Sequence, residues 1–135
     1  MAALTENSMR NTQKPLVPIK TYFDVPASTE IFKGAICHIN AAGEATPVDG
    51  VATKIVAGIA AEYYKSGASA TTNKPLPVEF NHLVWLPTGA LTKADIGKAV
   101  YASDDNTVTL TSLNNCLIGT IADFRSGEVL VHVHR

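Results

Sequence analysis

Residues 91 to 119 read LTKADIGKAVYASDDNTVTLTSLNNCLIG. Within this stretch Thr92 and Asp95 have the spacing of a capping box, and Gly97 is placed to end the single turn that they begin. The segment AVYASDDNTVTL then predicts a hairpin, because Asp and Asn accept the backbone angles of a tight turn. We interpret the stretch as a capped corner, a hairpin and a return strand.

The same pattern continues on both sides of this stretch. Runs such as IFKGAICHIN, KIVAGIAAEYY, LPVEFNHLVWLP and EVLVHVH are rich in β-branched and aromatic residues, and clusters such as NAAGEATPVDG, PTG and RSG separate them. Short strands between turn-forming clusters predict an all-β, single-domain barrel or sandwich with one short helical turn. Alternation places Cys37 and His38 on opposite faces of their strand, and Gly58 predicts a bulge or a close backbone approach.

The first 27 residues differ from the rest of the chain. They are polar and irregular and contain three prolines, so we expect an extended N-terminal arm over 1–27 and the β domain over 28–135. An alternative is a disordered tail followed by one ordinary edge strand. The arm also carries apolar residues that a linker does not need, and we predict that they contact a neighbouring subunit: Leu16, Val17, Ile19, Tyr22 and Phe23.

Composition limits the classes of partner. The chain has 135 residues, 17% charged residues and a formal net charge of −1, which is typical of a single soluble domain that hides part of its surface against partners. Lys and Arg never occur side by side, so we expect no nucleic-acid partner. We also expect no membrane partner, because the chain lacks an apolar stretch of membrane-spanning length, and no secretory signal, because the N-terminus lacks an apolar core.

The candidate reactive residues do not form a catalytic pattern. Cys37 and Cys116 lie in apolar runs, which favours buried free thiols and folding in a reducing cytoplasm. Asp104 and Asp105 are adjacent in a turn, so their side chains point apart and serve the turn. We predict no catalytic residue, no cofactor and no enzyme activity.

Histidines and aromatic residues leave two other possibilities open. His132 and His134 lie two apart in a strand and share a face, so they could bind a metal with His38 or His82, although no third ligand has a characteristic spacing. We predict surface or interface histidines and no metal. We assign a possible interface role to three aromatic residues, which are also the candidate platform of a carbohydrate- or ligand-binding module: Tyr63, Tyr64 and Trp85.

The order of the short motifs resembles the capsid decoration, or structural cement, proteins of tailed bacteriophages. The resemblance covers roughly residues 31 to 133, and it depends on glycine-led strands, a strand that ends in LP and a threonine-rich hairpin. The matching segments are Gly34 to Ile39, Gly58 to Ala60, Leu86–Pro87, Gly97 to Tyr101, Thr107 to Thr111, Ile118–Gly119 and Gly127 to Val131.

The resemblance implies a mechanical function. It implies a non-enzymatic virion protein, made in the host cytoplasm, that binds the outer surface of the major capsid shell and stabilises it. The partners would be the major capsid protein and further copies of the chain, as a homotrimer in preference to a dimer. Two alternatives stay open: a carbohydrate- or ligand-binding β module on a virion, and a small β-barrel enzyme that uses a histidine-bound metal.

Overall fold

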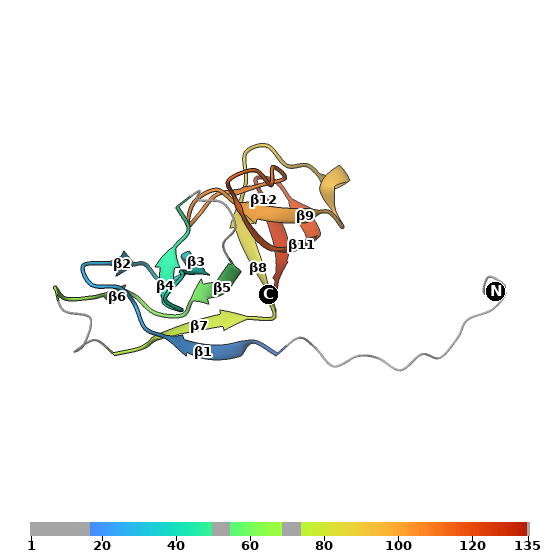
Figure 1. Ribbon diagram of the computed structural model, residues 1–135. Coiled ribbons are helices and arrows are strands. Elements are labelled where there is room, and N and C mark those ends of the chain that lie inside the picture. Colours follow the sequence, from blue (N-terminus) through green and yellow to red (C-terminus); the bar gives the residue numbers. More distant parts are fainter. Residues whose placement is uncertain (1–16, 50–54, 69–73, 135) are drawn as a thin grey trace, which may run out of the picture.

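The computed structural model describes residues 17–49, 55–68 and 74–134, and almost all regular structure in them is β-strand (Figure 1). No helix in these residues is long and apolar enough to cross a membrane. The strands are β1 (Ile19–Phe23), β2 (Glu30–Ile31), β3 (Ile36–Ile39), β4 (Ala45–Pro47), β5 (Ile55–Ala60), β6 (Tyr64–Lys65), β7 (Leu76–Phe80), β8 (His82–Pro87), β9 (Ala99–Ala102), β10 (Val108–Thr109), β11 (Cys116–Arg125) and β12 (Glu128–Val133).

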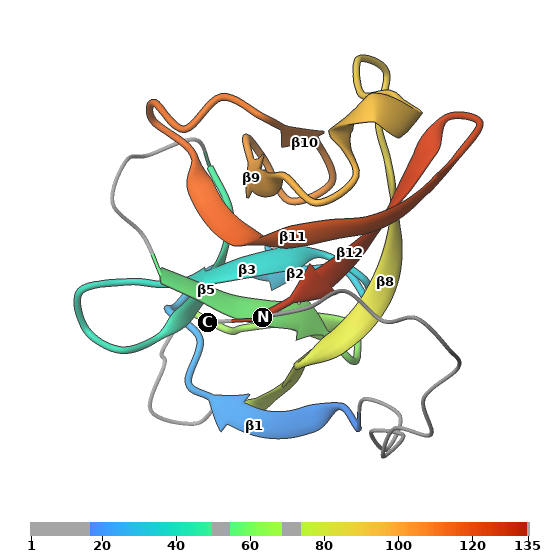
Figure 2. The same ribbon diagram turned by 90° about the vertical axis from the view of Figure 1, so that its right-hand side faces the viewer.

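The strands form two five-stranded antiparallel sheets and one small two-stranded sheet. Sheet A has the order β1-β7-β5-β3-β4, and sheet C has the order β10-β9-β11-β12-β8. Strands β2 and β6 pair separately. Figure 2 shows the two large sheets stacked, with β11 and β12 over β3 and β5. The predicted all-β fold is therefore confirmed for the described residues, and of the two predicted forms, barrel or sandwich, they form the sandwich.

Two apolar cores lie on the two faces of sheet A. The larger core lies between the sheets, and it includes Ile36 of β3 together with Ile118 and Val131 of sheet C. The smaller core lies on the opposite face, where Cys37 packs with residues such as Val25 and Ile31. Neighbouring residues of β3 thus enter different cores, because successive side chains of a strand point to opposite faces. Burial on both faces explains the nearly continuous apolar run of this strand.

One continuous run of sequence joins the two sheets. Strand β7 belongs to sheet A and β8 to sheet C, and only Asn81 separates them. Asn81 has φ 60°, and its backbone N–H donates to the carbonyl oxygen of Val133 at 2.7 Å. Asn tolerates this left-handed conformation better than most residues, so the chain can bend here and change sheets.

The predicted corner and hairpin are both present. The 3₁₀ helix η2 (Lys93–Asp95) begins at Thr92, whose hydroxyl accepts a hydrogen bond from the Ala94 N–H, while the Thr92 N–H donates to Asp95. Strands β9 and β10 pair as a hairpin. In its turn, the Asn106 N–H donates to the Asp104 carboxylate at 2.8 Å, which confirms the turn role of Asp104.

Candidate interaction surfaces

Strand β1 is the edge of sheet A and carries most of the predicted arm contacts. It pairs with β7 in continuous register from Ile19 to Phe23, and its other edge pairs with no strand in the described residues. Val17 and Tyr22 are 70% and 65% exposed, whereas Phe23 packs against the smaller core. Val17, Ile19 and Tyr22 are therefore available to a partner, and Phe23 supports the fold.

The structure places the second half of the predicted arm against the β domain. Residues 19–23 form an ordinary edge strand, as in the alternative given above, and Val25 is only 1% exposed in the smaller core. The Lys20 ammonium group lies 3.9 Å from the Glu79 carboxylate on β7. Leu16, the remaining predicted contact, lies outside the described residues.

The three predicted interface aromatics occupy different surroundings. Tyr63 is exposed and its hydroxyl donates to the Glu30 carboxylate at 2.5 Å. Tyr64, in the neighbouring position, packs on the smaller core and donates to the carbonyl of Lys74. Trp85 lies on β8 in the other sheet, where the Arg125 guanidinium covers its ring at 4.1 Å from the centroid. Tyr63 and Tyr64 lie just before and on β6 of the small sheet, whereas Trp85 lies on sheet C, so the three do not form one continuous aromatic platform.

The outer face of sheet C adds apolar residues that the sequence reasoning did not select. Trp85 faces Leu130 across the β8–β12 pair, and Leu83 on the same side of β8 is exposed. Leu117 on β11 is also exposed and pairs with Tyr101. The signal was present as alternation in HLVWLP, where every second residue shares a face.

The histidines lie in two separate places. His132 and His134 share a face as predicted, with ring centroids 5.0 Å apart, and the Nε2 atom of His132 lies 3.3 Å from the Asn81 side-chain oxygen. Burial lowers the pKa of His132, and that of His82 as well. His38 is buried in β3, and its Nε2 atom is 2.8 Å from the Thr46 hydroxyl. Among the described residues, no three His, Cys, Asp or Glu side chains are grouped as metal ligands.

Both cysteines are buried free thiols, as predicted. Burial raises the pKa of Cys37 to about 12, with a smaller contribution from the Asp105 charge, and raises the pKa of Cys116 to about 11. The reactive thiolate form is therefore disfavoured at neutral pH in both cases. These thiols act as small apolar side chains in the two cores.

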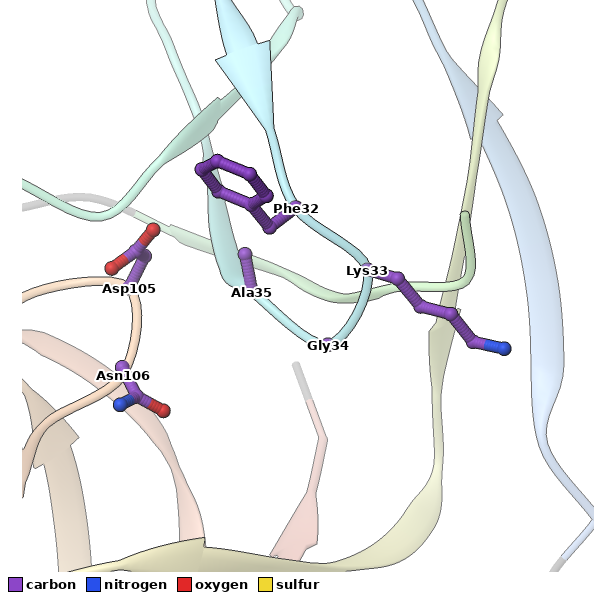
Figure 3. Close-up of a pocket in the computed structure, with 6 residues that line it drawn as sticks. All are labelled: Phe32, Lys33, Gly34, Ala35, Asp105 and Asn106. Carbon is purple, nitrogen blue, oxygen red and sulfur yellow. The ribbon is translucent and has the colours of Figure 1, made fainter. Parts of the chain in front are cut away.

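A surface depression lies where two turns meet (Figure 3). Its volume is about 370 Å³, and its lining comes from the turn before β3 and the turn between β9 and β10. The exposed ring of Phe32 forms one wall, and Asp105 and Asn106 lie across from it. Sequence reasoning missed Phe32, because only its place in the turn after β2 exposes it.

Comparison with known proteins gives one likeness of fold. Neither a protein-family model nor a curated protein matches the chain. The chain is similar to a chain in the solved structure of the capsid of Myoviridae phage XM1, with a TM-score of 0.56 and 17% sequence identity. The likeness covers 99% of this chain and 96% of that chain, so the two share a fold along nearly their whole length.

Proposed function

We propose that this protein is a non-enzymatic structural protein of a phage virion, which binds the outer surface of the major capsid shell and stabilises it. The observation that carries the proposal is the fold shared with a chain of a phage capsid, over almost the full length of both. The motif order that resembles decoration proteins, found independently in the sequence, supports the same function. Among the kinds of protein that make up a capsid, this motif order favours a decoration protein.

Strand β1 and the chain before it form the proposed contact with the shell. Exposed Ile19 and Tyr22 on β1, and Val17 just before it, lie at the edge of sheet A that pairs with no strand of the described residues. An unpaired edge can accept a strand from another chain through backbone hydrogen bonds, and exposed apolar side chains add affinity and specificity. Many copies on one shell would multiply a modest contact energy.

The rest of the molecule is suited to bearing load. The two large sheets share one apolar core and are also joined covalently at Asn81. A force applied at β1 is passed through β7 directly into β8 and sheet C, without a flexible linker between the sheets. We propose that the protein acts as a homotrimer, which would place three such contacts on one unit.

The test uses expanded shells of the cognate phage that lack this protein. Purified full-length protein is expected to co-sediment with these shells and to raise the temperature at which they rupture. A variant without residues 1–16 and the double variant Val17→Ser, Tyr22→Ser are expected to bind at least ten-fold more weakly while remaining folded. Leu113→Ser is the matched control, because Leu113 is 75% exposed and lies in the loop between β10 and β11 of sheet C, whereas β1 belongs to sheet A.

Two results would contradict different parts of this proposal. Failure of the full-length protein to bind any shell would refute the decoration function. Binding that is equally tight in the truncated and double variants would refute only the role of β1 and the preceding residues. Light scattering of the purified protein tests the trimer, and a monomer or dimer mass would overturn it.

A further inference from the structure

We propose that the depression between Phe32 and Asp105 is a carbohydrate-binding site that holds a neutral sugar ring. This activity is separate from shell binding and does not depend on it. The six lining residues come from two turns: Phe32, Lys33, Gly34 and Ala35 before β3, and Asp105 and Asn106 between β9 and β10. The volume of about 370 Å³ lies at the lower end of the range for small-molecule sites.

The two turns are held together before any ligand binds. The Ile36 N–H donates to the Asp105 carbonyl oxygen at 2.8 Å, which joins one turn to the other. The Gly34 N–H donates to the Ala60 carbonyl oxygen at 2.9 Å, and this bond fixes the first turn on sheet A. A site built from fixed backbone loses little entropy on binding, so even a small ligand can be retained.

Phe32 supplies a flat apolar surface. Phe32 is 59% exposed, so its ring is accessible to a ligand. Tyr63 supports the ring from one side, with centroids 5.7 Å apart, and Glu30 in turn holds the Tyr63 hydroxyl at 2.5 Å. An exposed aromatic ring in a fixed position is the surface on which the apolar face of a sugar ring can stack.

The opposite wall supplies polar groups that are not used by the fold. The neighbouring Asp104 carboxylate is occupied by the turn, whereas the half-buried Asp105 carboxylate makes no hydrogen bond or ion pair with the described residues. The Asn106 side-chain amide likewise has no partner among them. A carboxylate and an amide side by side can accept from, and donate to, the hydroxyl groups of one sugar.

Charge favours a neutral ligand. Lys33 contributes an ammonium group to the same rim, and Figure 3 shows its side chain extending to the side away from Asp105. A depression with one positive and one negative group has no strong field of a single sign, so neither a phosphate nor a guanidinium is preferred. Hydroxyl groups, which both donate and accept, satisfy both kinds of group.

The experiment is an NMR titration of the full-length, isotope-labelled protein with glucose, galactose, mannose and N-acetylglucosamine, each up to about 50 mM. At least one sugar is expected to shift the backbone amides of residues 32–36 and 105–106 with millimolar affinity. Phe32→Ala and Asp105→Asn are expected to weaken that binding at least five-fold. Tyr22→Ala is the matched control, because Tyr22 is an exposed aromatic residue on β1, outside the depression.

Three outcomes would overturn the proposal. The first is no shift at these amides with any of the four sugars. The second is a shift that Phe32→Ala and Asp105→Asn leave unchanged. The third is tighter binding of methylguanidinium than of any sugar, which would identify the depression as a site for a basic side chain. Proton spectra of each variant confirm that it is folded, so that lost binding is not mistaken for lost structure.

Discussion

Gly119 lies on β11 between β9 and β12, at a bulge where the register with β9 shifts. Its φ is +157°, and a Cβ placed there would overlap the backbone carbonyl of His132, with the carbonyl carbon at 2.8 Å. We therefore expect Gly119→Ala to destabilise the protein by about 3 kcal/mol or more, since the central strands must move apart. Urea unfolding measures this change.

Gly89→Ala is the control for this prediction. A Cβ added at Gly89 would meet no atom within 4 Å, and the backbone there has no positive φ. We expect the stability of this variant to stay within about 0.5 kcal/mol of the original protein. An equal effect of the two substitutions would show that backbone crowding at Gly119 is not the cause.

We expect stability to depend on pH through His82, at the start of β8, and His132, near the end of β12. Burial lowers the pKa of His82 and His132 below 6.5, and for His132 the neighbouring His134 adds to the effect, while Glu79 opposes it for His82. The unfolded chain then binds protons more readily than the folded chain. Stability is thus fully present above pH 6.5, falls as the pH drops through 6.5 and levels off below the folded pKa values.

Thermal unfolding at pH 8 and pH 5.5 tests this dependence. We expect a lower melting temperature at pH 5.5, and a smaller difference in the double variant His82→Gln, His132→Gln. This window lies above the ordinary pKa values of Asp and Glu side chains, which are about 4. The same pH dependence in the variant and the original protein would rule these histidines out as its source.

At the scale of elements, local patterns were predictable and the assignment of strands to sheets was not. Thr92, Asp95 and the turn at Asp104 were predicted because each depends on residues a few positions apart. The run LPVEFNHLVWLP reads as a single strand, yet it divides at Asn81 and enters two sheets. Asn81 permits a bend at this point, but the sheet that each half joins depends on the distant strands β1 and β12.

For the candidate surfaces, too, some features could be predicted from the sequence and others could not. The apolar residues around β1 were predicted, because apolar side chains in a polar, proline-bearing segment are conspicuous. Which of them face outward depends on pairing with β7, and the exposure of Phe32 depends on the turn before β3. The depression it lines joins residues about 70 positions apart, whose contact the sequence does not reveal.

Neighbouring substitutions on β1 separate its part in the fold from its proposed part in shell contact. Phe23 packs on the smaller core, so Phe23→Ala is expected to destabilise the protein by about 2 kcal/mol, less than for a fully buried Phe. Tyr22 is exposed, so Tyr22→Ala is expected to change stability by less than about 0.5 kcal/mol. Urea unfolding of the two variants provides the comparison. A larger loss for Tyr22→Ala would mean that this side chain is needed for folding and not for contact.

For the whole molecule, the arrangement predicts a single cooperative unfolding transition. The main core contains Ile36 and Val56 of sheet A and Ile118 and Val131 of sheet C, so neither sheet can separate without exposing the apolar face of the other. The continuous strand through Asn81 strengthens this coupling. The two sheets could unfold independently only if each had a core of its own. Of the two cores, only the smaller one forms without residues of sheet C.

Two probes in different sheets test this cooperativity. Trp85, the single tryptophan, reports on sheet C through its fluorescence, and labelling of the Cys37 thiol in a Cys116→Ala variant reports on sheet A. We expect both probes and far-UV circular dichroism to give the same urea midpoint within experimental error. A Cys37 midpoint clearly below that of Trp85 would show that sheet A opens first. Sheet A, which includes β1, would then unfold before sheet C. The proposal that force passes from β1 into sheet C without local unfolding would be wrong.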